Sequence, residues 1–282
     1  KTTCAPSRWF AGYDIGTMGR LSNMFSSTAN RGALMPFITG GYPEKGMTAR
    51  VIRTLVDTGV DAIEVGIPFS DPIADGPVIA ESMHLALQGG ANPASVFSEI
   101  ESVRKDVDIP IIAMVSFSIV VKSGGPQFIR NAAEAGFDGF IIPDCDIAGI
   151  DSVLEEIDRH NLAFSTLVAP DTSDERLAAI AGLAREFIYL LARKGITGES
   201  SRAPEISRSI ARVNAVSDLP IAAGFGISNP EHVSTVLQSA QGAIVGSALV
   251  RVMSEAHRCG DDVCAAARRC IEPLVNAVRV GG

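Results

Sequence analysis

Acidic residues gather in one short stretch of this chain, residues 61–77, at a spacing that suits proton transfer. Glu64 lies inside an apolar run at 62–67, which predicts a buried strand. Burying an ionised carboxylate is costly, so a strand glutamate must be hydrogen-bonded, paired or protonated. Asp71 and Asp75 follow on the next segment. One acid on a strand and two just after it form an arrangement suited to general acid/base catalysis.

The strand at 62–67 also predicts which side chains accompany the acid. Alternation places Glu64 and Gly66 on one face and Ile63, Val65 and Ile67 on the other. The prolines at 68, 72 and 77, with the glycine at 76, predict a fixed loop after the strand. A solvated turn beside a chance glutamate is the alternative, which is disfavoured because glutamate is uncommon between β-branched neighbours in a strand.

Glycine-rich segments follow three later strand-like runs and predict a phosphate site. They span residues 192–201, 224–229 and 246–247. Glycine lets backbone N–H groups approach an anion, and a helix that begins at 246–247 would add free N–H groups and the positive end of its dipole. Gly198, Gly226 and Gly246 are therefore candidate backbone donors, and Ser247 is the candidate hydroxyl donor. Turns use glycine constantly, so the prediction depends on all three segments together.

Two aromatic residues on other strand-like runs, Phe37 and Tyr189, are candidates to line the space between the acids and the phosphate site. Either could equally be an ordinary core residue. The inferred ligand is a phosphorylated small molecule with an apolar body. The inferred chemistry is proton transfer without a metal or a redox cofactor.

The elements that must position these residues repeat along the chain. Strand-like runs are expected at 34–39, 62–67, 111–115, 139–142, 163–168, 187–191, 220–223 and 243–245. Helix-like segments are expected at 47–58, 93–105, 126–135, 150–160, 174–184, 204–217, 230–239 and 262–278. This alternation predicts an α/β fold, a parallel (β/α)8 TIM barrel whose active site lies at the carboxyl ends of the strands. A doubly wound open sheet is the alternative, but no Gly-x-Gly-x-x-Gly sequence follows an early strand.

The N-terminal part of the chain predicts two further features. Residues 1–17 do not begin with methionine and are expected to be a flexible arm, a leader remnant or a tag. Residues 18–30 predict a helix with Leu21, Met24 and Phe25 at helical spacing, which would cover the bottom of the barrel. Residues 18–282 are expected to form a single barrel domain.

Composition excludes several classes of protein. The formal net charge of −8 argues against nonspecific nucleic-acid binding, and no apolar run approaches the roughly 20 residues that span a bilayer. Five scattered cysteines do not predict a disulfide framework, so a reduced, cytoplasmic protein is expected. His257, Cys259, Cys264 and Cys270 cluster near the C-terminus, but their spacing matches no common zinc pattern, so no metal is expected.

Residues 64–77 resemble the most specific signature of one known family, the tryptophan synthase alpha subunits. Further motifs fall in register with that family at residues 36–39, 143–144, 189–198, 224–228 and 246–247. The resemblance extends over roughly residues 18–257. The ordered set of motifs is more specific than any one of them.

The resemblance implies a retro-aldol cleavage of indole-3-glycerol phosphate to indole and glyceraldehyde 3-phosphate. It implies that Glu64 protonates indole C3 and takes the proton of the glycerol hydroxyl, while Asp75 holds the indole N–H and stabilises the cationic indolenine. It also implies that Tyr189 lies near the catalytic glutamate, that Phe37 belongs to the indole pocket, and that Thr197 lies on a loop that closes over the site. The residues that match the family's phosphate binders are Gly198, Gly226, Gly246 and Ser247.

The resemblance also implies a partner. Members of the family work in a complex with a β subunit that carries pyridoxal phosphate, and indole passes between the subunits through a tunnel. No cofactor is therefore assigned to this chain itself. A heterotetramer of two α and two β subunits is expected, with contacts near Asp71, Pro72 and Arg193–Gly195.

Some positions depart from the family pattern without touching the two catalytic acids. They are Ser116, Ser118, Asp146, Asp171, Ala192 and Lys194. Ser116 and Ser118 stand where many members have Tyr and Asn. Together, these departures are expected to affect the packing of the pocket, the affinity for the partner and the closure of the loop. Two other functions stay open: a stand-alone lyase that releases free indole, and a weakly active partner-binding or regulatory barrel. A different phosphosugar aldolase or isomerase is disfavoured, because no lysine lies in a strand-like run and no histidine cluster follows one.

Overall fold

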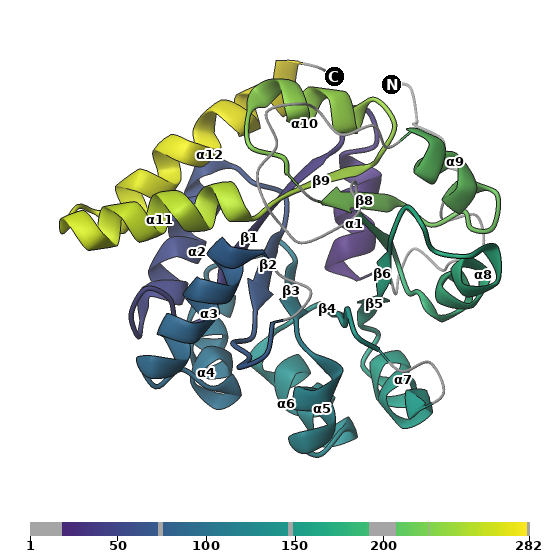
Figure 1. Ribbon diagram of the computed structural model, residues 1–282, viewed down its shortest axis with the longest axis horizontal. Coiled ribbons are helices and arrows are strands. Elements are labelled where there is room, and N and C mark those ends of the chain that lie inside the picture. Colours follow the sequence, from purple (N-terminus) through teal and green to yellow (C-terminus); the bar gives the residue numbers. More distant parts are fainter. Residues whose placement is uncertain (1–18, 73–75, 146–148, 192–206, 225, 281–282) are drawn as a thin grey trace.

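The computed structural model describes residues 19–72, 76–145, 149–191, 207–224 and 226–280, and Figure 1 shows its strands surrounded by helices. The strands are β1 (Ala33–Thr39), β2 (Ile63–Gly66), β3 (Ile111–Met114), β4 (Gly139–Ile141), β5 (Ala163–Ser165), β6 (Leu167–Val168), β7 (Ile188–Leu191), β8 (Ile221–Gly224) and β9 (Gly242–Val245). The helices are α1 (Arg20–Ser27), α2 (Met47–Thr58), α3 (Pro77–Gln88), α4 (Pro93–Arg104), α5 (Phe117–Lys122), α6 (Pro126–Ala135), α7 (Asp151–Arg159), α8 (Asp174–Leu183), α9 (Ser207–Asn214), α10 (Pro230–Leu237), α11 (Ser247–Cys259) and α12 (Val263–Val280).

The sheet closes on itself through one interrupted strand. The strands pair in the order β5-β4-β3-β2-β1-β9-β8-β7-β6, and all these pairs are parallel. Only Thr166 separates β5 from β6, so they are two halves of the single strand expected at 163–168. One half pairs with β4 and the other with β7. The predicted (β/α)8 barrel is therefore confirmed, with its fifth strand interrupted.

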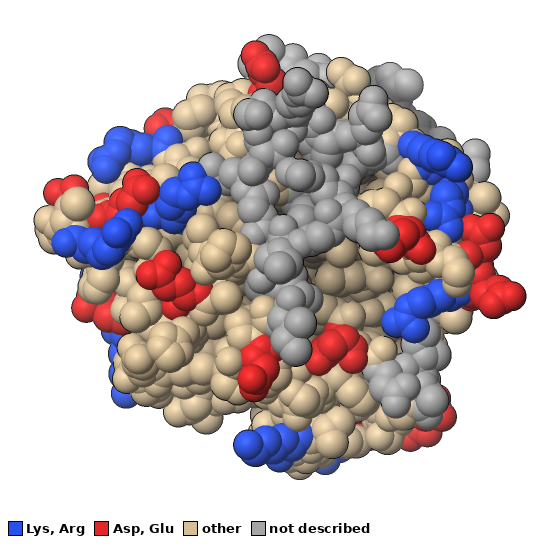
Figure 2. Space-filling model, viewed as in Figure 1, with Lys and Arg blue, Asp and Glu red and all other residues tan. Residues whose placement is uncertain are grey.

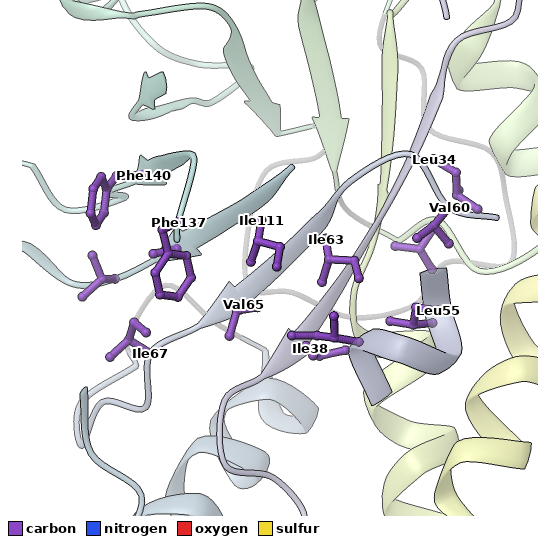
Figure 3. Close-up of a cluster of buried hydrophobic side chains, with 14 of the residues drawn as sticks. Leu34, Ile38, Leu55, Val60, Ile63, Val65, Ile67, Ile111, Phe137 and Phe140 are labelled. Carbon is purple, nitrogen blue, oxygen red and sulfur yellow. The ribbon is translucent and has the colours of Figure 1, made fainter. Parts of the chain in front are cut away.

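The strands separate the apolar core into an outer layer and an inner barrel cluster, as the alternation of side chains along the strands predicts. Ile63, Val65 and Ile67 are buried in the outer layer, between the strands and the helices, together with Ile38 of β1 and Leu55 of α2 (Figure 3). The opposite face of each strand points into the barrel, where a second and smaller cluster is packed. The two faces predicted for residues 62–67 are confirmed.

Helix α1 covers the bottom of the barrel, as its spacing predicts. Leu21, Met24 and Phe25 are buried against the inner barrel cluster, and the ring of Phe25 lies 6.4 Å from that of Phe187 between centroids. The backbone N–H of Ser22 donates to the carboxylate of Glu186 at 3.1 Å. Burial raises the pKa of Glu186 from its ordinary value. The arm expected at residues 1–17 lies outside the described residues.

The sequence predicts a loop that extends from the end of β2 through Pro77, and this prediction is wrong for Pro77, which belongs to a helix. Gly76 is the N-cap of α3 and Pro77 is its first residue. Proline is tolerated there because the first helical N–H has no partner within the helix. A second helix that the sequence did not predict is α5, which follows β3 and is capped by Ser116.

Two surface and length features of the described residues concern nucleic acids and membranes, namely the distribution of basic side chains and the length of the apolar helices. On the face drawn in Figure 2, lysine and arginine side chains lie mostly toward the edge and form no single central basic area among the described residues. Within the same residues, no helix is both long enough and apolar enough to cross a membrane.

Candidate active site

Glu64 is carried into the barrel by β2. It lies in the middle of the strand, on the same face as Gly66 and opposite the outward-packed isoleucine and valine side chains. The residue is 0 % exposed, and both of its carboxylate oxygens are buried. In the strand register Glu64 is paired with Phe37 of β1 on one side and Ile112 of β3 on the other. The barrel interior therefore holds the candidate acid away from bulk water.

Phe37 lies between the candidate acid and the candidate phosphate site. A Cβ atom at Gly66 would lie 2.6 Å from Cζ of Phe37, so the ring occupies the space that a side chain at Gly66 would need. On the other side, a Cβ at Gly246 would lie 3.6 Å from the Cβ of Phe37. The ring packs in a cluster, here the Phe37 cluster, whose buried members are Phe37, Tyr42, Ile79, Met83, Ala86 and Val250. Phe37 is thus placed to contact the apolar body of a ligand that spans both ends.

The candidate phosphate site includes the start of α11. Gly246 is the N-cap of this helix and has no side chain to cap it, and Ser247 is the first helical residue. Both are partly exposed. A helix start offers N–H groups without intrahelical partners and a positive dipole end, which together favour an anion. The helix expected from residues 246–247 is confirmed.

Gly226 supplies a second part of this end of the barrel. Its backbone has φ of 72°, in the left-handed region that favours glycine. The buried ring of His232 lies at 3.2 Å from the Gly226 carbonyl oxygen through Nδ1. Asn229 caps α10 by accepting from the N–H of His232 at 2.9 Å. His232 thus links the carbonyl of Gly226 to the start of α10.

Tyr189 enters the barrel interior from β7. The residue is buried, and its N–H donates to Oγ of Ser165 at 2.8 Å. A Cβ at Gly224 would lie 2.4 Å from the Tyr189 hydroxyl, so the glycine on β8 makes room for that hydroxyl. The structure places Tyr189 among core residues of the inner barrel cluster.

An apolar cavity of about 450 Å³ lies where β2, β3 and β4 end, here the β2–β4 cavity. Its lining residues are Ile67, Phe69, Asp71, Pro72, Met83, Met114, Val115, Ser116, Ser118, Pro143 and Asp144. Asp144 accepts from Oγ of Ser116 at 2.6 Å and from the N–H of Phe117 at 2.7 Å. These bonds fix the start of α5 against the loop that follows β4.

Several predicted site residues lie outside the described residues. They are Asp75, Thr197, Gly198 and Arg193–Gly195, together with the departures Asp146, Ala192 and Lys194. Their roles stay predictions. Of the predicted partner contacts, Asp71 is exposed and Pro72 is partly exposed.

Four residues near the site were not singled out for a role from the sequence. Met83 and Met114 line the β2–β4 cavity, Asp144 anchors α5, and His232 contacts the Gly226 carbonyl. Methionine is a common core residue, so its position in the sequence carries no signal of a binding site. The Pro143-Asp144 pair at the end of a strand was the one visible signal among them.

The arrangement can perform proton transfer on a ligand with an anionic end. The buried Glu64 is paired in the strand register with Phe37, and the uncapped start of α11 at Gly246 lies on the other side of Phe37. In the described part of the chain, no three His, Cys, Asp or Glu side chains are arranged to hold a metal ion.

Comparison with known proteins adds an independent finding. A family model described as tryptophan synthase alpha chain matches residues 25–278. The tryptophan synthase alpha chain of Halorhodospira halophila is 39% identical over 242 residues, which cover 84% of this chain and 89% of that protein.

Solved structures agree with the sequence comparison. Tryptophan synthase subunit alpha from Legionella pneumophila superposes with a TM-score of 0.85 at 32% identity, covering 93% of this chain and 99% of that one. A chain of Mycobacterium tuberculosis tryptophan synthase superposes with a TM-score of 0.84 at 34% identity, with the same coverage of 93% and 99%. The family-model match spans the whole interval from Phe37 to Ser247 in which the candidate residues lie.

Proposed function

This chain belongs to the tryptophan synthase alpha chain family, and from that premise we propose that its lyase reaction runs through Glu64. The reaction is the cleavage of indole-3-glycerol phosphate to indole and glyceraldehyde 3-phosphate in tryptophan biosynthesis. The observation that carries the proposal is the position of Glu64, wholly buried in mid-strand and paired in register with the ring-bearing Phe37.

Glu64 moves protons in this proposal. It protonates C3 of the indole ring, and the resulting indolenine accepts the electron pair of the breaking carbon–carbon bond at its nitrogen. The glycerol hydroxyl becomes the aldehyde carbonyl of glyceraldehyde 3-phosphate, and its proton goes to Glu64. Asp75 holds the ring N–H and stabilises the positive charge that forms there. Exclusion of water around a buried acid strengthens each of these interactions.

The other predicted residues bind the substrate at its two ends. Phe37 contacts the indole ring, and Tyr189 lies against the reacting centre from β7. Gly226, Gly246 and Ser247 bind the phosphate, supported by the left-handed turn at Gly226 and the uncapped start of α11. Thr197 and Gly198 belong to the loop that closes over the substrate, with Gly198 also donating to the phosphate.

The family implies a tryptophan synthase β subunit as the partner. We propose an α2β2 complex whose contact surface includes Asp71, Pro72 and Arg193–Gly195; the exposure of Asp71 supports that assignment. Pyridoxal phosphate belongs to the β subunit, and this chain needs no cofactor of its own. We place the protein in the cytoplasm, with residues 18–282 as a single barrel domain.

Indole release tests the reaction and the dependence on a partner. The purified chain is supplied with indole-3-glycerol phosphate, alone and with a β subunit, and serine is omitted so that the β subunit cannot consume the indole. Slow release alone and a large rise with the partner support a synthase subunit, and fast release alone supports a stand-alone lyase. The β subunit by itself is the control. Release in neither condition refutes the proposed reaction.

A further inference from the structure

None of the described residues given a role in proton transfer or phosphate binding lines the β2–β4 cavity, whereas Asp71 and Pro72 of the proposed β-subunit contact do. Its volume of about 450 Å³ falls within the range of small-molecule sites. Most of its lining side chains are apolar, and it lies at the carboxyl ends of three neighbouring strands. That is the end of the barrel at which the phosphate-binding turns also lie, and Glu64 lies in the middle of β2.

Two methionines join the cavity to the candidate active site. Met83 and Met114 line the cavity, and both also pack in the Phe37 cluster. The methyl group of Met83 lies 3.3 Å from the position of a Cβ at Gly66, the residue that faces the ring of Phe37. Methionine has three rotatable bonds and adapts readily to a change in its surroundings. The wall between the two spaces is therefore deformable.

The order of the strands gives the direction in which the cavity lies. The candidate phosphate binders follow β8 and β9, and Glu64 lies on β2, with β1 and Phe37 between them. The cavity follows β2, β3 and β4, so it lies on the far side of Glu64 from the phosphate. A substrate that reaches from the phosphate site past Phe37 directs its aromatic ring toward the cavity.

Small side chains keep the far wall of the cavity open. Ser116 and Ser118 line it, and their hydroxyl oxygens lie 2.9 Å apart. Asp144 binds the Ser116 hydroxyl and holds both serines at the start of α5. A larger residue at 116 would occupy part of the cavity volume.

We propose that the β2–β4 cavity receives substituents on the benzene ring of the substrate. The chain then cleaves indole-3-glycerol phosphates that carry a small apolar group on that ring, and Met83 and Met114 move aside for the group. Ser116 determines this specificity through its small volume. The inference rests on the proposed function, because it takes indole-3-glycerol phosphate as the parent ligand.

The test compares substrates that carry one methyl group at each free carbon of the benzene ring. The full chain is assayed with and without a β subunit, and kcat/KM is compared with that of the unsubstituted substrate. Ser116→Tyr fills the cavity. Ser116→Ala is the matched control, since it loses the hydrogen bond to Asp144 and the cap of α5 without adding volume. Ser118→Phe is a second filling variant, assayed in the same way if the first does not fold.

The parent chain is expected to cleave at least one methylated substrate with kcat/KM within about threefold of the unsubstituted one. Filling the cavity should lower kcat/KM for that substrate by about 10-fold or more, the usual effect of one misfitting methyl-sized group, with the unsubstituted substrate little affected. Ser116→Ala should match the parent on both. The inference is overturned if every methylated substrate is cleaved about 100-fold more slowly by the parent, or if filling changes both substrates alike. Failure to cleave even the unsubstituted substrate refutes the proposed function as well, so the two failures are distinguishable.

Discussion

Gly66→Ala should displace the ring of Phe37, because the two residues occupy the same space. The new Cβ would lie 2.6 Å from Cζ and 2.8 Å from Cε2 of that ring. Carbon atoms in contact are usually separated by about 3.5 Å or more, so the ring edge must move by about 0.9 Å. It cannot move freely, because Met83 and Val250 pack against it in the same cluster.

The expected loss of stability follows from that displacement. Overpacking of a core by one methyl group usually costs about 1–3 kcal/mol. Replacing glycine also restricts the unfolded chain, which stabilises the fold by about 0.4–1 kcal/mol. The free energy of unfolding should therefore fall by about 1.3 kcal/mol, the difference between the middle values of the two ranges. A shift of the ring by this distance should also lower kcat/KM by up to about 100-fold, because productive geometry is lost.

Urea unfolding and indole release measure the two effects on the same preparation. Gly182→Ala is the matched control: apart from its chain neighbours and the backbone of its own helix α8, no atom lies within 4 Å of the new Cβ. That variant should gain up to about 1 kcal/mol of stability, the helix preference for alanine. A Gly66→Ala protein as stable and active as the Gly182→Ala protein would refute the reasoning. A double-mutant cycle with Phe37→Leu should show a coupling energy between positions 37 and 66.

Three further substitutions test other parts of the account. Ser247→Ala should raise KM about 10-fold with a smaller change in kcat, because one hydrogen bond to the charged phosphate is lost. Steady-state kinetics measure both constants, and an unchanged KM would show that Ser247 does not bind phosphate. At Glu156, burial raises the pKa but hydrogen bonds from Arg159 and Arg130 outweigh it and lower the pKa below its ordinary 4.5. The parent should therefore lose stability relative to Glu156→Gln as pH falls below about 4.5 in urea unfolding, and parallel curves would contradict this. Burial raises the pKa of Glu186 in the folded protein, so the parent should lose stability relative to Glu186→Gln as pH rises above 4.5. A stability difference between the two proteins that does not change with pH would contradict the raised pKa of Glu186.

Most of the fold could be predicted because its signals are periodic. Alternation at 62–67 gave the inward face of Glu64 correctly, and helical spacing placed the covering helix α1. The break at Thr166 could not be predicted, since residues 163–168 contain no glycine or proline that would mark an interruption of the strand. Helix α3 was missed because prolines usually mark loops, whereas Pro77 takes the one helical position that needs no N–H partner.

The candidate site was less predictable than the fold. Glu64 and the start of α11 at Ser247 have local signals, an acid in an apolar strand and a glycine before a helix. The position of Phe37 between them depends on strand register and on the missing side chain of Gly66, and neither can be read from one segment. The β2–β4 cavity depends on side chains from several separate segments, which only the closed barrel brings together.

The most direct test of the central claim is the rate of indole-3-glycerol phosphate cleavage by Glu64→Gln in single turnover, with the β subunit present. Glutamine keeps the size of the side chain and removes its ability to donate and accept a proton. Loss of a general acid/base should lower the rate by about 10²- to 10⁴-fold, with urea unfolding showing that the fold is retained. A folded Glu64→Gln protein that releases indole at the rate of the parent would contradict the assignment of the reaction to this carboxylate.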